Sequence, residues 1–277
     1  LGKGGSSMKI RKGLRYVVLS LISFIMILPL LWMLGTSLKE PTRVFTQFIP
    51  NPIRWENYLE VLSNEVFLMQ YWNSIYIATL VTLLTILFSS MAGYAFARIS
   101  FHGRNALFLL LLSVIMIPPE VTIIPLFLLM REFGWIDTHL PLIILPVFGP
   151  AGAFGIFLMR QFFLTVPGEL EEAAEMDGCS RWGIYWRLMM PLAVQSISTL
   201  TIFTFITNWD EFLTPLILVN ERELMTLPVG LSLFTDETGT AWHHMMSATS
   251  LATIPLLIIF FLAQKKFIEG MTAGSLK

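Results

Sequence analysis

Residues 71–97 read YWNSIYIATLVTLLTILFSSMAGYAFA, a run of 27 residues without a single Asp, Glu, Lys or Arg. A helix of about 20 apolar residues crosses the ~30 Å hydrocarbon core of a bilayer, so this run is long enough to span one. The rest of the chain is similar, because 55% of its 277 residues are hydrophobic. Only 13% are charged, against about 25% in soluble domains. The composition excludes an ordinary water-soluble fold and indicates a membrane protein.

Six such runs occur along the chain, at residues 16–37, 71–97, 106–130, 140–159, 188–219 and 245–264. Membrane strands need only about 10 residues each and alternate polar with apolar side chains, which these runs do not. The first run follows several basic residues, as in a signal peptide, but its length and the lack of a small-residue cleavage pattern favour a retained helix. We therefore predict an all-α, polytopic membrane protein with six transmembrane helices.

The distribution of basic residues predicts the orientation. If the N-terminus is cytoplasmic, 13 of the 18 Lys and Arg residues lie in inside segments and 5 lie outside, as the positive-inside rule requires. An even number of spans then places residues 1–15 and 265–277 in the cytoplasm, on either side of a transmembrane domain at 16–264. Residues 1–7, with Gly4-Gly5-Ser6-Ser7 before Met8, are typical of an added segment or a misassigned start, and the fold argument leaves them out.

Two simple counts restrict the chemistry further. The single cysteine, Cys179, excludes a disulfide within the chain. The formal net charge of −1 gives no sign of a nucleic-acid partner.

Residues 161–190, the central loop, differ most from the rest of the chain. Pro167 and the acids that follow predict a helix start, with negative charge near the positive end of the helix dipole. Gly178 predicts a break or left-handed turn, Ser180 can cap a second short helix, and Pro191 opens the fifth span. We expect a helix-turn-helix along the cytoplasmic face. The acids are Glu169, Glu171, Glu172, Glu175 and Asp177.

The order of residues in this loop resembles a known family. Glu172-Ala173-Ala174, then Gly178, and then Leu188, Met190 and Pro191 resemble the loop motif of membrane-spanning (permease) subunits of bacterial ABC importers, with Met190 in place of the usual leucine. The string 171–178 is similar to the carbohydrate branch, close to the second permease subunit of maltose-type transporters. Asn208-Trp209-Asp210-Glu211-Phe212 and the tail Glu269-Gly270-Met271-Thr272-Ala273-Gly274 add to the resemblance.

The resemblance implies a type I ABC importer permease fold in the bacterial cytoplasmic (inner) membrane, importing a sugar or related polar solute. A short coupling helix between helices 4 and 5 would dock in a cleft of a separate ATPase. The implied partners are a homologous second membrane subunit, two ATP-binding subunits, an extracytoplasmic solute-binding protein and the lipid bilayer. The residues implied in ATPase docking are Glu172, Ala173, Ala174, Asp177, Gly178 and Pro191.

The sequence contains no catalytic machinery of its own. It has no Gly-x-x-x-x-Gly-Lys-Ser/Thr phosphate loop, so we expect ATP and Mg²⁺ to bind to the partner ATPase, with no cofactor in this chain. No metal site is expected, because His243 and His244 are adjacent rather than at ligand spacing, and His102 and His139 stand alone. The chain is therefore predicted to be a transport subunit and not an enzyme.

Acids near membrane depth are candidates for contact with the solute. Glu120 follows Pro118-Pro119, which distort the third span. Asp210 and Glu211 come about 20 residues after Pro191, roughly 30 Å along a helix, and so near the outer boundary.

Polar side chains also recur along the fifth span. Thr201, Thr204, Asn208 and Glu211 follow spacings of 3, 4 and 3, which place them on one helix face. That face suits a polar pathway, and hydrogen bonding between spans explains it equally well. Trp209, like Phe212, is either an interfacial anchor or a stacking platform. The pathway candidates are Glu120, Thr204, Asn208, Trp209, Asp210 and Glu211.

The longest outer loops are residues 38–70 and 220–244. The resemblance implies that the outer loops contact a solute-binding protein, and the polar, turn-prone stretch 235–240 lies where such a contact would begin. Its candidates are Thr235, Asp236, Glu237 and Gly239. An alternative function is an ion-coupled secondary transporter that uses Glu120, Asp210 or Glu211. The acidic central loop favours the importer.

Overall fold

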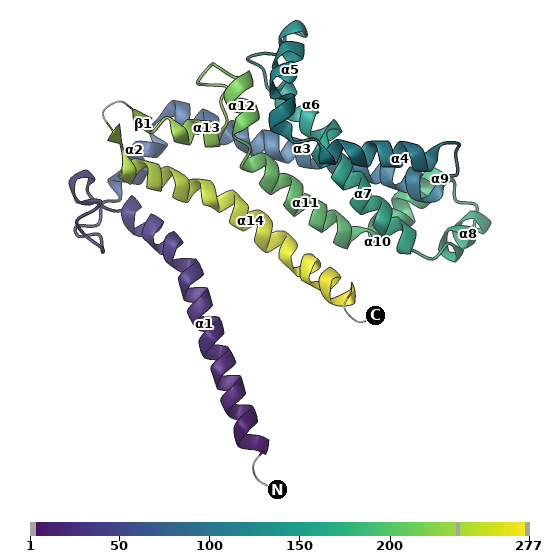
Figure 1. Cartoon of the computed structure of the whole chain (residues 1–277), viewed down its shortest axis with the longest axis horizontal. Helices are drawn as coiled ribbons and strands as arrows, with labels where there is room; N and C mark the ends of the chain where they lie inside the picture. The colour runs from purple at the N-terminus through teal and green to yellow at the C-terminus, as the bar shows by residue number, and fades with distance from the viewer. Residues whose placement is uncertain (1–3, 237–238, 275–277) are drawn as a thin grey trace. The chain divides into compact units, whose positions relative to one another are not determined.

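The computed structural model describes residues 4–236 and 239–274 (Figure 1). The chain forms two compact units. Unit 1 comprises Leu1–Glu65 and Leu231–Thr253, and unit 2 comprises Val66–Gly230 and Ile254–Lys277. Helices dominate both units, which confirms the all-α prediction.

Unit 1 contains α1 (Gly4–Ser37), the 3₁₀ turn η1 (Pro41–Arg43), α2 (Glu56–Leu62), the end of α13 (Leu227–Ser232), strands β1 (Thr235–Asp236) and β2 (Gly239–Thr240), and the start of α14 (Trp242–Gly274). Unit 2 contains α3 (Glu65–Arg98), α4 (Arg104–Ser113), the 3₁₀ turn η2 (Val114–Met116), α5 (Pro119–Glu132), α6 (Leu140–Phe148), α7 (Pro150–Thr165), α8 (Glu169–Met176), α9 (Arg181–Ile184), the π-helical turn η3 (Tyr185–Met189), α10 (Met190–Leu192), α11 (Val194–Trp209) and α12 (Leu213–Leu218).

The membrane spans agree in number with the prediction. Four helical stretches are long and apolar enough to cross a bilayer: Lys12–Ser37, Glu65–Arg98, Leu140–Thr165 and Trp242–Leu262. Two bent helix pairs also qualify, Arg104–Met116 with Pro119–Glu132, and Arg181–Leu192 with Val194–Trp209. Each pair counted as one span gives the predicted total of six.

The third predicted span, residues 106–130, is broken rather than merely distorted. Its two halves meet at 98°. Ile117 is extended (φ −85°, ψ 116°), as expected for a residue before proline, and Pro118 is extended as well. Pro119 then occupies the first turn of α5, where its missing N–H costs nothing. Glu120 therefore lies in the first turn of a new helix.

The fifth predicted span, residues 188–219, is not one helix either. Arg181–Leu192 and Val194–Trp209 meet at 75° around Ala193, and α11 ends at Trp209. Pro191 lies in α10, before the bend, so it does not open the long helix. The prediction that one continuous helix runs from Pro191 to Asp210 is therefore wrong.

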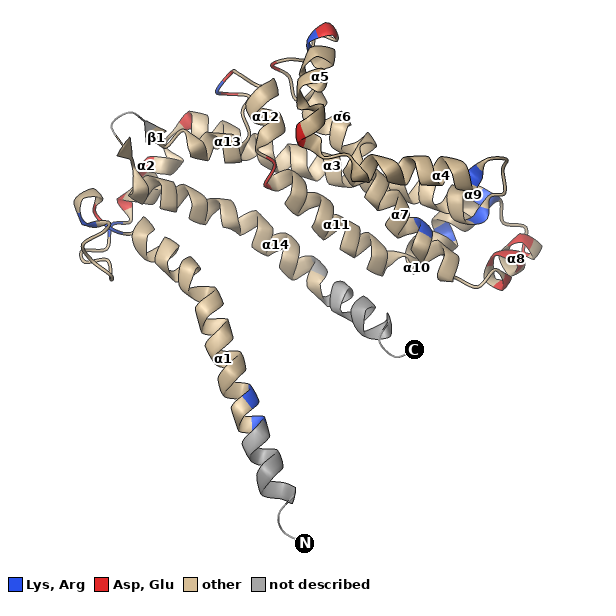
Figure 2. Cartoon of the chain, in the orientation of Figure 1, with Lys and Arg blue, Asp and Glu red and all other residues tan. Residues whose placement is uncertain are grey.

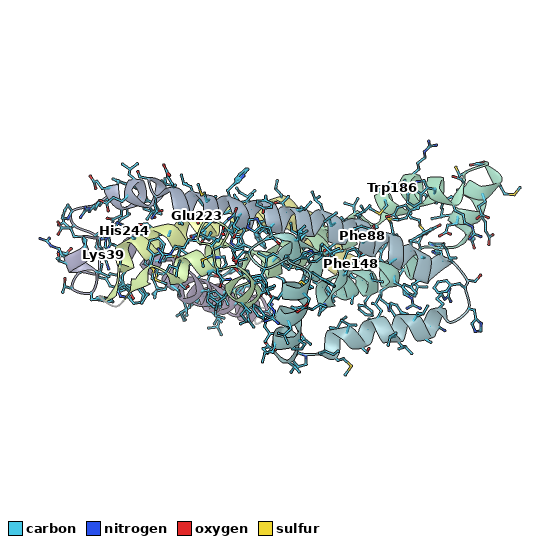
Figure 3. The ribbon with its side chains drawn as sticks, turned by 90° about the horizontal axis from the view of Figure 1, so that it is seen from above. Lys39, Phe88, Phe148, Trp186, Glu223 and His244 are labelled. Atoms are coloured by element: carbon cyan, nitrogen blue, oxygen red, sulfur yellow. The ribbon has the colours of Figure 1, made fainter. Side chains whose placement is uncertain are left out.

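Within unit 2, α3 and α7 approach closely. A Cβ atom added at Gly93 would lie 2.7 Å from the Cβ of Met159, so only glycine permits this crossing. Ser89 donates a hydrogen bond to the carbonyl of Gly152 in α7 (3.1 Å). The ring of Phe88 also packs on that of Phe148, the last residue of α6, with centroids 5.2 Å apart (Figure 3). These contacts hold α3 against α7, which leads into the central loop, and against the end of α6.

Within unit 1, buried polar groups join α1, α2 and α14. The Asn57 amide donates to the carbonyls of Ser37 (2.8 Å) and Lys39 (2.9 Å), and Ser247 donates to the same Ser37 carbonyl (3.1 Å). Lys39 is 1% exposed, donates to the Val44 carbonyl and lies 4.3 Å from the centroid of Trp32. Burial lowers the pKa of Lys39.

Candidate functional site

The central loop forms the predicted helix-turn-helix. Between α8 and α9, Gly178 adopts φ +81°, the left-handed conformation that glycine takes at little cost. Ser180 caps α9, because its hydroxyl accepts the Gly183 N–H at 3.2 Å. One detail differs from the prediction: α8 begins at Glu169, so Pro167 precedes the first turn rather than lying in it.

α8 has an outward and an inward side. Glu169, Glu172, Ala173 and Met176 follow the spacing i, i+3, i+4, i+7, so they share one helix face, and all are exposed. Met176 is 89% exposed. Figure 2 shows Asp and Glu covering α8, with Lys and Arg on neighbouring segments at that end of unit 2. We call these four residues the α8 outer face.

The inward side of α8 packs on the chain itself. Ala174 and Cys179 lie against a buried cluster that includes Tyr94, Phe163 and Tyr185. Only Ala173 of the two motif alanines is therefore exposed for a partner. Asp177, Gly178 and Pro191, the other residues implied in docking, are exposed.

Glu171 also points to the inward side. Its Oε1 lies 2.9 Å from Nε of Arg98, and both side chains are 17% exposed. Burial raises the pKa of Glu171, and the positive charge of Arg98 opposes this shift. The sequence placed Glu171 among the acids of the central loop but gave no sign of its pairing with Arg98.

Two exposed tryptophans follow the turn. Trp182 is 59% exposed and Trp186, labelled in Figure 3, is 43% exposed. Their rings meet edge to face with centroids 6.1 Å apart. Exposed aromatic side chains are typical of interface residues. These tryptophans were not among the predicted site residues, although their i, i+4 spacing beside Arg181 and Arg187 was a pattern that could have identified them.

The polar residues of α11 are bonded within their own helix. The Thr201 hydroxyl donates to the Ile197 carbonyl (2.7 Å), and the Asn208 amide donates to the Thr204 carbonyl (2.7 Å). Thr204 is 3% exposed. The face that the spacing predicted is therefore only partly present in this structure, since Glu211 lies beyond the end of α11.

Trp209 is also inside unit 2. It is 3% exposed, stacks on Phe205 with centroids 5.7 Å apart, and meets Tyr71 edge to face at 6.0 Å. Trp209 thus joins α11 to α3 and does not reach the surface as a membrane anchor would.

The acidic pathway candidates lie on separate elements. Glu120 is exposed in the first turn of α5, and Asp210 is exposed just past α11. Glu211 has a local role, because its Oε1 accepts the Thr214 N–H (2.9 Å) at the start of α12. α5 contacts α12, the short helix that follows the end of α11 (Figure 1).

In unit 1, Thr235, Asp236 and Gly239 form a small antiparallel hairpin. Thr235 pairs with Thr240, Asp236 pairs with Gly239, and the Thr235 and Thr240 hydroxyls lie 3.0 Å apart. Glu237, another candidate for binding-protein contact, lies outside the described residues.

Polar side chains of α3 hold residues 220–227 in place within unit 2. They were not among the predicted site residues. The Asn73 amide donates to the Glu223 and Met225 carbonyls (2.7 and 3.0 Å). Ser74 accepts the Leu227 N–H (2.8 Å), and Gln70 donates to the Arg222 carbonyl (2.9 Å). Gln70, Asn73 and Ser74, which we call the α3 clamp, share one face of α3 at i, i+3, i+4 spacing, and that pattern was the available signal.

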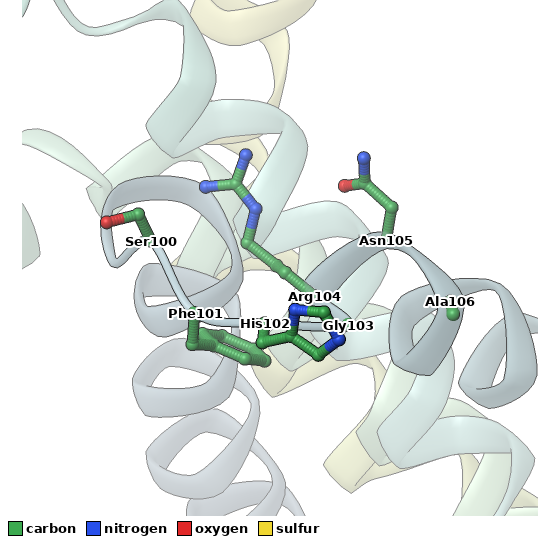
Figure 4. Close-up of a pocket in the computed structure, with 7 residues that line it drawn as sticks. All are labelled: Ser100, Phe101, His102, Gly103, Arg104, Asn105 and Ala106. Carbon is green, nitrogen blue, oxygen red and sulfur yellow. The ribbon is translucent and has the colours of Figure 1, made fainter.

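A surface hollow of about 360 Å³ lies at the turn between α3 and α4 (Figure 4). Its lining comes from residues 100–106 alone, including His102 and Arg104. None of the predicted pathway residues lines it.

Comparisons with known proteins extend this description. Residues 85–272 match the model of a family described as "Binding-protein-dependent transport system inner membrane component". The matched region contains the whole central loop and the two broken spans.

The sequences of several known proteins align with nearly the whole length of this chain. An arabinooligosaccharides transport system permease protein, AraQ, of Halalkalibacterium halodurans is 33% identical over 92% of this chain and 93% of its own. A lactose transport system permease protein, LacG, of Rhizobium radiobacter is 33% identical over 95% of both chains. The trehalose/maltose transport system permease protein MalG of Thermococcus litoralis is 33% identical over 93% of this chain and 94% of its own.

The fold has a close structural counterpart. A chain from the crystal structure of a bacterial ABC transporter involved in the import of the acidic polysaccharide alginate superposes with a TM-score of 0.83 at 24% identity, covering 94% of this chain and 98% of that one. The likeness confirms the type I importer permease fold. With six candidate spans, an exposed acidic loop helix and a family model that matches most of its length, the chain belongs to the inner membrane components of binding-protein-dependent transport systems, the ABC importer permease subunits.

Proposed function

We propose that this permease subunit forms half of a translocation pathway for a carbohydrate and couples that pathway to a separate ATPase subunit through α8. The observation that carries the proposal is the α8 outer face, which stays exposed while the opposite side of the helix is packed on the chain's own core. Glu172 offers a carboxylate for a charge-assisted bond, Ala173 permits close approach, and Met176 offers an adaptable apolar contact.

The solute class is proposed from the relatives. Three of these relatives are named as transport proteins for arabinooligosaccharides, for lactose, and for trehalose or maltose, which are all carbohydrates. The family description supports a solute-binding protein as a further partner. In the proposed assembly, ATP and Mg²⁺ bind to two ATPase subunits, and a homologous membrane subunit completes the pathway. Binding calorimetry of candidate sugars with the solute-binding protein would identify the solute.

Substitution at Gly178 tests the coupling role. A side chain at φ +81° costs about 1–2 kcal/mol of conformational free energy. This changes an equilibrium constant by a factor of roughly 5–30. Nothing lies within 4 Å of a Cβ added there, so the cost is conformational rather than steric. We expect Gly178→Ala to weaken co-purification of the ATPase and ATP-driven uptake by about this factor. Gly178→Pro should abolish both, because proline cannot reach positive φ and loses the N–H that bonds the Glu175 carbonyl.

Gly168 supplies the matched control. It lies in the same loop at φ −63°, has equal space around it, and tolerates an alanine. Gly168→Ala should transport normally. The proposal is wrong if Gly178→Pro still transports with ATP, or if wild-type uptake in vesicles persists without ATP and collapses with an ion gradient. The second result would instead support a secondary carrier.

A further inference from the structure

Arg98 occupies a junction of three helices. It is the last residue of α3, and its Nη2 donates to the carbonyl of Phe163 at 2.7 Å. The same nitrogen donates to the carbonyl of Val166, just past the end of α7. Its Nε lies 2.9 Å from Oε1 of Glu171 in α8, an ion pair whose two buried atoms are not aligned for a hydrogen bond. One guanidinium thus bridges the ends of α3 and α7 and the start of α8.

The chemistry of arginine suits this position. Carbonyl groups at a helix C-terminus carry partial negative charge, so a cation there is favourable for both α3 and α7. The planar guanidinium presents several N–H donors in a fixed fork, and so it can serve carbonyls and a carboxylate together. A lysine would supply the charge without this geometry.

The packing below the junction is tight. Tyr94 meets Phe163 edge to face with centroids 5.7 Å apart, and the Ser90 hydroxyl lies 2.7 Å from that of Tyr185. Ala174 of α8 lies against this cluster. α8 is therefore connected to α3 and α7 both through packed side chains and through Arg98.

Stability alone does not explain the ion pair. Burial raises the pKa of Glu171 even with Arg98 beside it, so the ionised carboxylate is held at a cost in hydration. Partly buried ion pairs are weak sources of net stability, and their best-attested use is to specify one arrangement. The arrangement specified here is the position of α8 relative to α3 and α7.

We propose that Arg98 is a positioning residue for coupling: through Glu171 it ties α8 to the ends of α3 and α7, so that displacement of α8 becomes displacement of these two membrane helices. This rests on the proposed function, in which α8 contacts the ATPase. Glu171 faces the chain and not the α8 outer face, so its loss should leave ATPase binding in place.

The test uses the assembled transporter in proteoliposomes, with three readouts: co-purification of the ATPase, ATP hydrolysis, and solute taken up per ATP hydrolysed. The main variant is Glu171→Gln, which removes the charge but keeps the shape and leaves the Arg98 bonds to the two carbonyls. We expect uptake per ATP to fall at least about fivefold, with the ATPase still bound. Fivefold is the factor that corresponds to the smallest typical coupling free energy between two sites. Glu175→Gln is the matched control, because Glu175 is an exposed acid of the same helix outside the α8 outer face.

A double-mutant cycle separates the pair from general damage. Arg98→Gln alone should lower uptake per ATP, and Arg98→Gln with Glu171→Gln should be no worse than the poorer single variant, because the same contact is lost. Additive losses would contradict the pairing. Normal uptake per ATP in Glu171→Gln, or loss of the ATPase from that variant alone, would overturn the positioning role. Failure of the wild-type complex to couple uptake to ATP would refute the proposed function itself.

Discussion

At the residue scale, a few side chains hold segments that no regular hydrogen-bond pattern would hold. Asp137, in the turn between α5 and α6, accepts the Asn220 N–H on its Oδ1 at 2.5 Å, and its own N–H bonds the Leu218 carbonyl at 2.9 Å. It also adopts φ 56°, a conformation that Asp and Asn accept better than other side chains. Asp137 thereby anchors the segment that follows α12.

We expect Asp137→Asn to loosen this segment at neutral pH. The Asn220 backbone N–H lowers the pKa of Asp137 below its usual 3.8, so the ionised form is the one that the folded state favours. This stabilisation is present above pH 3.8 and is lost as the pH falls through the lower folded-state pKa. Asparagine keeps the backbone tolerance and an acceptor oxygen but lacks the charge.

Hydrogen exchange at the Asn220 amide measures the effect. The Asp137→Asn protein should exchange faster than wild type at pH 7, and the two rates should converge as the pH falls through the lowered pKa of Asp137. A difference that persists unchanged at low pH would show that the charge is not the cause.

Some of these residue roles were readable from the sequence and others were not. The left-handed turn at Gly178 and the cap at Ser180 depend on neighbouring residues only, so local rules predicted both. The partners of Arg98 lie on α7 and α8, far along the chain, and the sequence offered no way to choose Glu171 among the five acids of the central loop. Such pairings depend on tertiary structure.

At the element scale, apolar run length predicted the six spans but not where they break. A run reports how many apolar residues are consecutive, and the runs 106–130 and 188–219 are apolar on both sides of their bends. Pro118-Pro119 marked the first break. The bend at Ala193 follows a π-helical turn, Tyr185–Met189, which has no simple sequence signal. The polar face predicted for the fifth helix is only partly present for a different reason, because α11 ends at Trp209, before Glu211.

The α3 clamp supports a prediction at this scale. Asn73 is 9% exposed and is the donor for two carbonyls of residues 223–225. Asn73→Ala leaves both acceptors without this donor, which costs about 1–3 kcal/mol for a buried polar group. We expect a lower thermal stability in detergent and faster exchange of the Leu227 amide.

Thr82→Val is the control for that variant. Thr82 is also buried on α3, but its hydroxyl bonds only the Ala78 carbonyl one turn earlier. It should leave Leu227 exchange unchanged. Equal effects in both variants would mean that any polar loss on α3 loosens the loop, and that the clamp is not specific.

At the scale of the whole molecule, membrane and partner surfaces dominate. The Lys12–Ser37 span is 0% buried within the chain, and the Trp242–Leu262 span is only 17% buried. Helices so apolar and so exposed need lipid or another protein subunit around them. A permease subunit with a second membrane subunit beside it meets that need.

The excess of Lys and Arg predicts that the central loop faces the cytoplasm. Labelling of single cysteines on the two sides of the membrane tests this orientation. Met176, on α8, and Glu223, in the segment held by the α3 clamp, are both exposed and belong to unit 2. In a Cys179→Ala background, which removes the single native thiol, we expect a membrane-impermeant thiol reagent to label Glu223→Cys in cells with a permeabilised outer envelope and an intact inner membrane. Met176→Cys should react only after the inner membrane is opened. Labelling in the reverse order would invert the topology and remove α8 from reach of a cytoplasmic ATPase. Labelling of both sites from one side would mean that the bent pair between them, Arg181–Leu192 with Val194–Trp209, does not cross the bilayer as one span.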